Sequence, residues 1–299
     1  MAADKVTIHR LIYDPEHYTR SFEIFAEMSS KYQVLSNWCD SVFPDIVCGK
    51  LELVNAKFGS TFRMLGVGSG SGETDLMMIL HLLKLFPSIH NIVVEPTADL
   101  AEKYRGLVQA KQHLIEGVET EWREQTLEGF QNSVGSSVFY HFISAIHSLY
   151  FTDDLRARLC YLYDLLEEGG VLLIVIIAED TGHVRVCKKF QHLESDYLMF
   201  PDADHVRKAY DEMGVKYQCV RQRSRVLVTE CLRADSEAGS LLLDFLLQVS
   251  HFRKTAPPKL QKEVLDYIES AVCCDSRDEN EEMLLSNDWE AIIVQKSTD

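Results

Sequence analysis

The chain has 299 residues, of which 46% are apolar, and its 46 acidic and 30 basic residues give a formal net charge of −16. This length and apolar content are enough for one large domain with a full core. The negative charge repels phosphate backbones and anionic lipid, so nucleic acid and membrane surfaces are excluded as favoured partners, and a small molecule is expected instead.

The sequence predicts no membrane span, no signal peptide and no cysteine-based site. No apolar run reaches the roughly 18 residues that a membrane span needs, and the start of the chain is too polar for a signal peptide. The eight cysteines form no CxxC pair, so their spacing predicts neither a zinc site nor a disulfide framework. We therefore expect a cytoplasmic protein without a metal.

In chain order, two helices are expected within residues 14–56, and apolar runs then alternate with amphipathic stretches. The runs predict strands at 62–67, 91–95, 118–122, 138–146, 170–178, 215–222 and 290–295. This alternation is typical of an α/β protein with a Rossmann-like, doubly wound, mostly parallel seven-stranded sheet.

Two segments fall outside that alternation within the single domain expected for residues 1–299. They are the N-terminal helices of 14–56 and a mostly helical, acidic insertion at 226–287, whose charged part at 274–282 is expected to be a solvated loop. Both segments are candidates for a substrate cap, and covering a sheet edge is an equally good interpretation.

The stretch "LGVGSGSGETDL" at 65–76 joins the first strand to a helix and contains four closely spaced glycines: Gly66, Gly68, Gly70 and Gly72. Such a loop turns sharply and brings backbone N–H groups close to a ligand. Glu95 follows Gly72 by 23 residues at the end of the second strand, where an acid binds the ribose of a nucleotide. Glu73 in the first helical turn repels a pyrophosphate and suits a cationic ligand, which favours S-adenosylmethionine over a dinucleotide.

Scattered motifs across the chain resemble the histamine N-methyltransferase family, which has the class I methyltransferase fold. They are "HYTRSFEIF" at 17–25, the glycine loop, "VVEP" at 93–96, "AEKYRGLV" at 101–108, "LYF" at 149–151, "GSLLLDFL" at 239–246 and "TAPP" at 255–258. The resemblance implies S-adenosylmethionine as methyl donor, a soluble monomer, and a substrate cap formed by the N-terminal helices and the late insertion.

Carried over residue by residue, the resemblance implies donor contacts at Gly68, Gly70, Glu95, Thr126 and Ile146. Two further positions depart from the family, because Leu100 and Leu127 stand where a glutamine and a serine are expected. Each lost hydrogen bond is worth about 0.5–1.5 kcal/mol, so donor binding is expected to persist.

The implied acceptor pocket differs from the family pattern in charge. Lys31 stands where a glutamate holds the amine of histamine, and His147 and Asp288 replace a glutamine and an asparagine that bind the imidazole. His183 and Cys187 replace two indoles. The aromatic residues expected to remain in the pocket are Tyr18, Phe22, Tyr150 and Phe245.

These residues predict an N-methyltransferase acting on a small imidazole or amine, with His147 and Asp288 as candidates for positioning the ring. A neutral imidazole already carries a lone pair, so neither a metal nor a strong base is required. Two alternatives stay open. Lys31 could pair with the carboxylate of an acceptor such as histidine or carnosine, or the chain could be a non-catalytic, ligand-binding homologue. Each of these polar residues also has a structural interpretation. Lys31 could point into solvent, His147 could be a structural histidine, and Asp288 could cap a turn.

Overall fold

The computed structural model describes residues 8–54, 58–59, 61–135, 137–152, 154–193, 200–270, 274–277 and 282–298. The chain divides into two compact units. The first unit comprises Met1–Val34, Ile177–Phe200 and Gln222–Trp289, and the second comprises Leu35–Ile176, Pro201–Arg221 and Glu290–Asp299.

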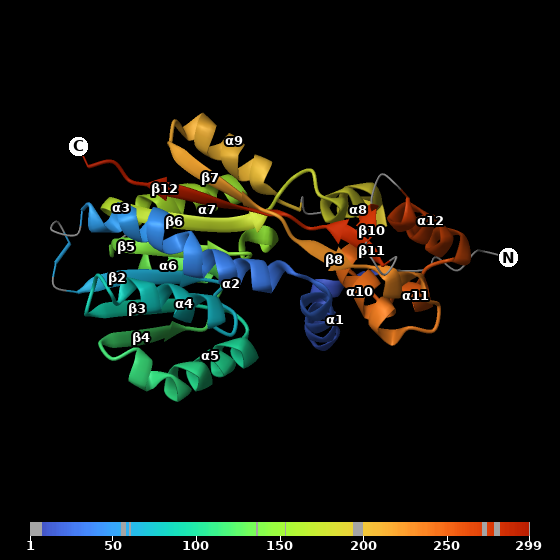
Figure 1. Ribbon diagram of the computed structural model, residues 1–299, viewed down its shortest axis with the longest axis horizontal. Helices are drawn as coiled ribbons and strands as arrows, with labels where there is room; N and C mark the ends of the chain where they lie inside the picture. The colour runs from blue at the N-terminus through green and yellow to red at the C-terminus, as the bar shows by residue number, and fades with distance from the viewer. Residues whose placement is uncertain are drawn as a thin grey trace. The chain divides into compact units, whose positions relative to one another are not determined.

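A seven-stranded sheet forms the framework of the second unit (Figure 1). Its strands are β2 (Phe62–Val67), β3 (Ile89–Val94), β4 (Val118–Arg123), β5 (Tyr140–Ile146), β6 (Leu166–Ile177), β7 (Tyr217–Gln222) and β12 (Trp289–Gln295). They lie in the order β4-β3-β2-β5-β6-β12-β7, and the pairs β4–β3, β3–β2, β2–β5 and β5–β6 are parallel. The predicted fold class is confirmed.

Helices on both sides of this sheet complete the second unit. They are most of α2 (Lys31–Ser41), α3 (Gly49–Glu52), α4 (Glu73–Leu82), α5 (Ala98–Ala110), α6 (Leu127–Val134), α7 (Leu155–Asp164) and α9 (Ala203–Met213), with a π-helix at Pro44–Cys48. The central strands bury apolar side chains such as Leu65, Ile143 and Leu172. Strands covered on both faces are expected to be continuously apolar, as "GVLLIVII" at 170–177 is in β6.

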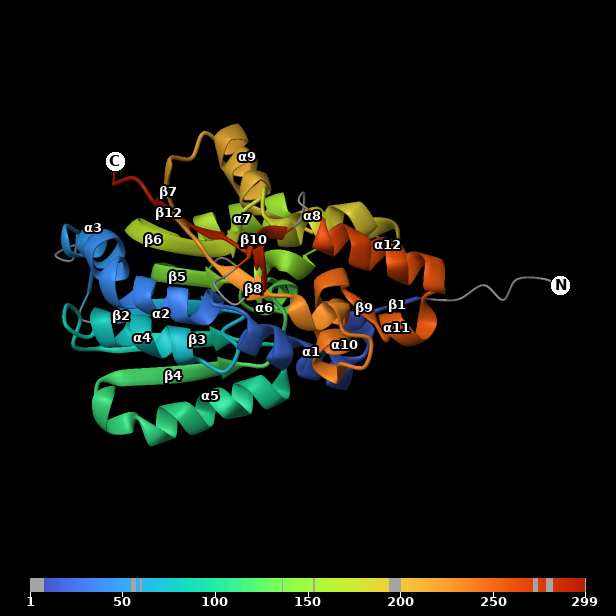
Figure 2. The same ribbon diagram turned by 45° about the vertical axis from the view of Figure 1, so that its right-hand side comes forward.

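The first unit is mostly helical and has its own core. Its helices are α1 (Pro15–Met28), α8 (Gly182–Phe190), α10 (Glu237–Leu247), α11 (Phe252–Thr255) and α12 (Pro258–Glu269), and α1 packs along α10 (Figure 2). Phe25, Leu242 and Phe252 are among the buried residues of that core. None of the helices in the described part of the chain has the length and apolarity that a bilayer crossing requires.

Two small sheets in the first unit were not predicted. β1 (His9–Arg10) pairs with β9 (Val249–Ser250), and β10 (Cys274–Arg277), β11 (Met283–Ser286) and β8 (Arg225–Leu227) form an antiparallel sheet. The expectation of a solvated loop over 274–282 is wrong for 274–277. Its strand depends on partners elsewhere in the chain, which local sequence does not reveal.

The two segments proposed as a cap are distributed differently between the units. Residues 14–34 and the described part of 226–287 belong to the first unit, whereas 35–54 belong to the second. Positions 55–56, 271–273 and 278–281 of these segments lie outside the described residues.

Candidate functional site

The glycine loop connects β2 to α4 through three left-handed glycines. Gly68, Gly70 and Gly72 have φ angles of 62°, 57° and 86°, which residues other than glycine rarely adopt. A Cβ on Gly68 would lie 2.4 Å from Cβ of Ser148, and one on Gly72 would lie 2.0 Å from the Tyr104 ring. A Cβ on Gly70 would meet nothing within 4 Å, so at Gly70 the loop leaves room for a ligand.

Glu95 follows β3 directly and is only 5% exposed. Its carboxylate accepts hydrogen bonds from the backbone N–H of Gly70 at 2.8 Å and of Thr97 at 2.9 Å. Each carboxylate oxygen can accept more than one hydrogen bond, so both retain capacity for a pair of hydroxyls. Glu95 therefore fixes the glycine loop and still offers the negative charge that a ribose diol binds.

The loop after β5 lies against the glycine loop, because β2 and β5 are neighbours at the point where the strand order reverses. Ligands of open α/β sheets bind at this reversal. Ile146 ends β5, and His147 follows with a left-handed φ of 52° and Nδ1 2.8 Å from the hydroxyl of Tyr150. The hydroxyl of Ser148 is buried without a hydrogen-bond partner among the described residues.

Two features of the second unit indicate whether a polar methyl-donor molecule fits there. An open left-handed Gly70 beside a buried acid provides a backbone cradle, and the Ser148 hydroxyl provides an unsatisfied polar atom at its edge. The residues present fit S-adenosylmethionine, which Gly70 and Glu95 would hold.

Asp75, which is not among the predicted site residues, is a buried acid next to this loop. It is 3% exposed, it accepts a hydrogen bond from the Tyr104 hydroxyl at 3.4 Å, and burial raises its pKa to about 6. A Cβ on Gly66 would lie 2.6 Å from its carboxylate. The available signal was an acid on an otherwise apolar helix face in "ETDLMMIL".

Thr126, the last of the residues predicted to contact the methyl donor, already has a hydrogen-bond partner in its own helix. The hydroxyl of Thr126 caps α6 by accepting a hydrogen bond from the N–H of Gly129 at 3.1 Å, which accounts for this threonine without a ligand. Leu127 begins α6 and Leu100 lies in α5, both partly buried.

An aromatic cluster in the first unit contains three of the four predicted pocket aromatics. Phe245 of α10 has its ring centre 5.9 Å from that of Phe22 and 6.2 Å from that of Tyr18. Phe25 stacks on Phe245 at 4.3 Å and was not predicted. Tyr150 belongs to the second unit and packs against its core.

Lys31 lies on these rings and does not face solvent. It is 7% exposed, and its Nζ is 5.3 Å from the ring centre of Phe25 and 4.9 Å from that of Tyr32. Within the described residues, the contacts of its ammonium are with the ring faces of Phe25 and Tyr32. Burial accordingly lowers the pKa of Lys31 to about 7.

His183 lies beside the same cluster, with its ring centre 5.8 Å from that of Phe25. Burial lowers its pKa to about 4, and the charge of Lys31 acts in the same direction, so the ring is neutral at pH 7. Its Nδ1 lies 3.0 Å from Oδ1 of Asn287, whereas its buried Nε2 has no hydrogen-bond partner in the described part of the chain. His183 and Asn287 were not predicted to act together.

Asp288 and Cys187 have partners within the first unit. The carboxylate of Asp288 accepts hydrogen bonds from Arg225 at 2.7 Å and from the N–H of Ser224 at 3.1 Å. These partners lie 63 and 64 positions away in the chain, so these contacts are long-range and are not the local turn cap that was the other interpretation of Asp288. Sγ of Cys187 lies 3.4 Å from the carbonyl oxygen of Leu246.

Comparison with known proteins shows similarity along nearly the whole chain. The chain is 30% identical over 295 residues to histamine N-methyltransferase of Danio rerio, covering 95% of this chain and 97% of that protein. It is also 30% identical to histamine N-methyltransferase B of Xenopus laevis, covering 96% and 98%. No protein-family model matches the chain.

The fold also resembles that of a solved bacterial structure. The YcgJ protein of Bacillus subtilis matches 84% of this chain and 99% of its own length with a TM-score of 0.51 at 15% identity. Such low identity shows a shared fold alone. The extent of the similarity to the vertebrate proteins, together with the glycine loop and its buried acid, establishes the lineage: the chain belongs to the histamine N-methyltransferase family of S-adenosylmethionine-dependent methyltransferases.

Proposed function

We propose that this protein transfers the methyl group of S-adenosylmethionine to a nitrogen of a small imidazole or amine. The observation that carries the proposal is the 30% identity to a histamine N-methyltransferase over 97% of that protein's length. The glycine loop supports it, because Glu95 holds the N–H of Gly70 and the space beside Gly70 is open. The proposal includes action as a cytoplasmic monomer, without nucleic acid or membrane as partner.

In methyl transfer, the protein's residues have to position the methyl donor and the acceptor nitrogen. The bound donor supplies an electrophilic methyl group on a sulfonium, and the acceptor nitrogen must approach it in line. Glu95 and Gly70 fix the donor end of that line. His147, whose ring is held by the Tyr150 hydroxyl at the end of β5, is the candidate for orienting the acceptor.

A methyl-transfer screen tests this function. The purified protein is incubated with S-adenosylmethionine and a panel of imidazoles and amines that includes histamine, and methylated product and S-adenosylhomocysteine are quantified. We expect stoichiometric formation of both with at least one compound. Donor binding without transfer to any compound would favour the non-catalytic homologue, and absence of donor binding would refute the proposal altogether.

A carboxylate-bearing acceptor is the second candidate, and Lys31 is the observation that favours it. A buried ammonium without a counter-ion is unfavourable, and an acceptor carboxylate placed next to Nζ of Lys31 would pair with it. Histidine and carnosine therefore belong in the panel beside histamine. Higher kcat/KM for the carboxylated compounds would support this candidate, whereas a clear preference for histamine would reject it.

A further inference from the structure

Two histidines and an aspartate from three separate segments of the first unit converge at one point. His17 lies in the first turn of α1, Asp244 near the end of α10, and His251 directly before α11. One ligand atom from each lies within 4.8 Å of the others. We propose that this cluster binds a divalent transition-metal ion of the Zn²⁺ class, a site independent of methyl transfer.

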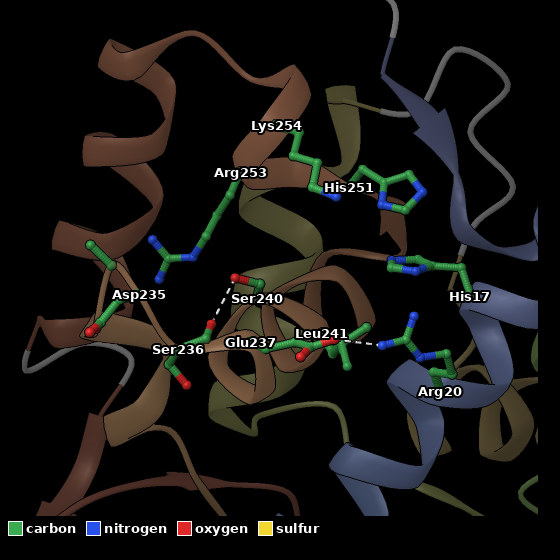
Figure 3. A pocket seen from close by; sticks show the side chains of 11 residues that line it. His17, Arg20, Asp235, Ser236, Glu237, Ser240, Leu241, His251, Arg253 and Lys254 are labelled. Carbon is green, nitrogen blue, oxygen red and sulfur yellow. Dashed lines mark hydrogen bonds and ion pairs between the residues drawn. The ribbon is translucent and has the colours of Figure 1, made fainter.

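The donor atoms are already close to a coordination arrangement. Nε2 of His17 is 2.6 Å from Oδ2 of Asp244, and the centres of the His17 and His251 rings are 4.1 Å apart. Figure 3 shows these two imidazole rings next to each other at one side of the pocket. Two imidazoles and one carboxylate form a three-ligand donor set that zinc accepts, with the fourth tetrahedral position left to water.

The backbone holds these side chains in place. His251 has a left-handed φ of 55°, and its N–H donates to Oδ2 of Asp244 at 2.9 Å. The N–H of Phe252 donates to Oδ1 of the same carboxylate at 2.8 Å. Asp14 caps α1 by accepting from the N–H of His17 at 3.2 Å. Hydrogen bonds of this kind orient metal ligands before an ion arrives.

The cluster has access to solvent through a cavity of about 310 Å³, which His17 and His251 help to line. Two of the three basic side chains in its wall have partners of their own. Arg20 pairs with Glu237 at 2.6 Å, and Arg253 donates to the carbonyl oxygen of Cys231 at 2.5 Å. Lys254 is the third. Glu237 neutralises the charge of Arg20, whereas a carbonyl partner leaves Arg253 positively charged. The carboxylate of Asp235 in the same wall offsets part of this positive charge.

Metal binding changes a defined set of bonds. The ion accepts lone pairs from the two imidazoles and from carboxylate oxygens, and it takes the place of the hydrogen bond between Nε2 of His17 and Oδ2 of Asp244. A neutral imidazole that binds the ion through Nε2 carries its one N–H on Nδ1, and a protonated imidazole releases one proton to solvent. The same ion links α1 to α10 and to the start of α11, so it stabilises the folded first unit.

Metal titration of the chelator-treated full chain tests the site. Zn²⁺ binding is measured by calorimetry and by competition with a chromophoric chelator, and Co²⁺ is used as a spectroscopic probe. Two variants remove a donor and preserve the backbone: His251→Asn, since asparagine tolerates a left-handed φ, and His17→Gln, since glutamine is a good helix former at this position of α1. His113→Asn at an exposed position is the matched control.

We expect one Zn²⁺ per chain, at least tenfold weaker binding in each donor variant, unchanged binding in the control, and a Zn²⁺-dependent rise in Tm that the donor variants lose. Co²⁺ should give tetrahedral visible bands without a thiolate charge-transfer band. Absence of saturable binding, a thiolate band, or equal affinity in correctly folded donor variants would each overturn the proposal, and His17 with Asp244 would then be a structural pair.

Discussion

The ammonium of Lys31 lies 4.9 Å above the ring of Tyr32, in a part of the first unit where the described chain supplies aromatic faces and no carboxylate to balance the charge. Cation–π contact compensates only part of the hydration that a buried ammonium loses. The protein therefore contains a cation that an anionic group of a ligand would stabilise.

Exchanging this charge should change acceptor preference. Lys31→Glu removes attraction for a carboxylate and supplies attraction for an ammonium, so the ratio of kcat/KM for histamine to that for a carboxylated imidazole should rise by more than tenfold. Lys111→Glu, on the exposed surface, is the matched control. A ratio that stays within about threefold, which is less than 1 kcal/mol, would show that acceptor choice does not depend on Lys31.

Lys31 also makes a prediction about stability and pH. Burial lowers its pKa from 10.5 to about 7, so between these values the unfolded state binds more protons than the folded state, and this group's contribution to stability rises with pH. Below about pH 7 both states are charged and the full penalty applies. Lys31→Met should therefore increase the free energy of unfolding most near pH 6 and least near pH 10.

Denaturant unfolding at the two pH values measures that difference. Methionine retains the apolar stem of the side chain and packs well against aromatic rings, so the comparison isolates the charge. Lys111→Met serves as the exposed control and should shift stability little at either pH. A stabilisation that is equal at pH 6 and pH 10 would mean that Lys31 is not a buried titrating group.

Glu95 is predicted to hold the methyl donor. Glu95→Gln keeps one oxygen for the N–H of Gly70, loses the hydrogen bond from the N–H of Thr97 and removes the negative charge, so Tm should fall moderately and affinity for S-adenosylmethionine at least tenfold. Each charge-assisted hydrogen bond is worth about 1.5–3 kcal/mol. Calorimetry with the donor measures this, with exposed Glu116→Gln as control. Equal affinities in the two variants would contradict the assignment of Glu95.

The glycines of the loop should respond differently to alanine. Gly70→Ala places a Cβ in open space, so the fold should lose only about 1–2 kcal/mol from the left-handed φ, while donor binding is strongly weakened. Gly68→Ala brings a Cβ to 2.4 Å from Cβ of Ser148 and should destabilise the protein more.

Adding Ser148→Gly to Gly68→Ala removes the contacting side chain and should recover part of the lost Tm. Thermal unfolding and donor titration of the three variants separate packing from ligand contact. Normal donor binding by folded Gly70→Ala would show that no ligand approaches the loop at Gly70.

Local sequence was sufficient to predict the sheet and the donor loop. Strands buried on both faces need continuous apolar runs, and the crossover helices need amphipathic ones, so the predicted strands agree with β2 to β7 and β12 within a few residues at their ends. Left-handed turns need glycine, which is why the glycine spacing in "GVGSGSG" is enough to indicate a strand-to-helix turn. Both patterns lie within short stretches of consecutive residues, so they can be recognised without knowing the tertiary structure.

The surroundings of the polar side chains, in contrast, follow from tertiary packing. Arg225 reaches Asp288 across 63 positions of the chain, and His17 reaches Asp244 across 227. The sheet of β8, β10 and β11 likewise joins segments whose strand character depends on their partners. Sequence alone could not place Lys31 on the Phe25 and Tyr32 rings, because a lysine in an amphipathic helix is ordinarily solvated, and its burial comes from packing between elements distant in the chain.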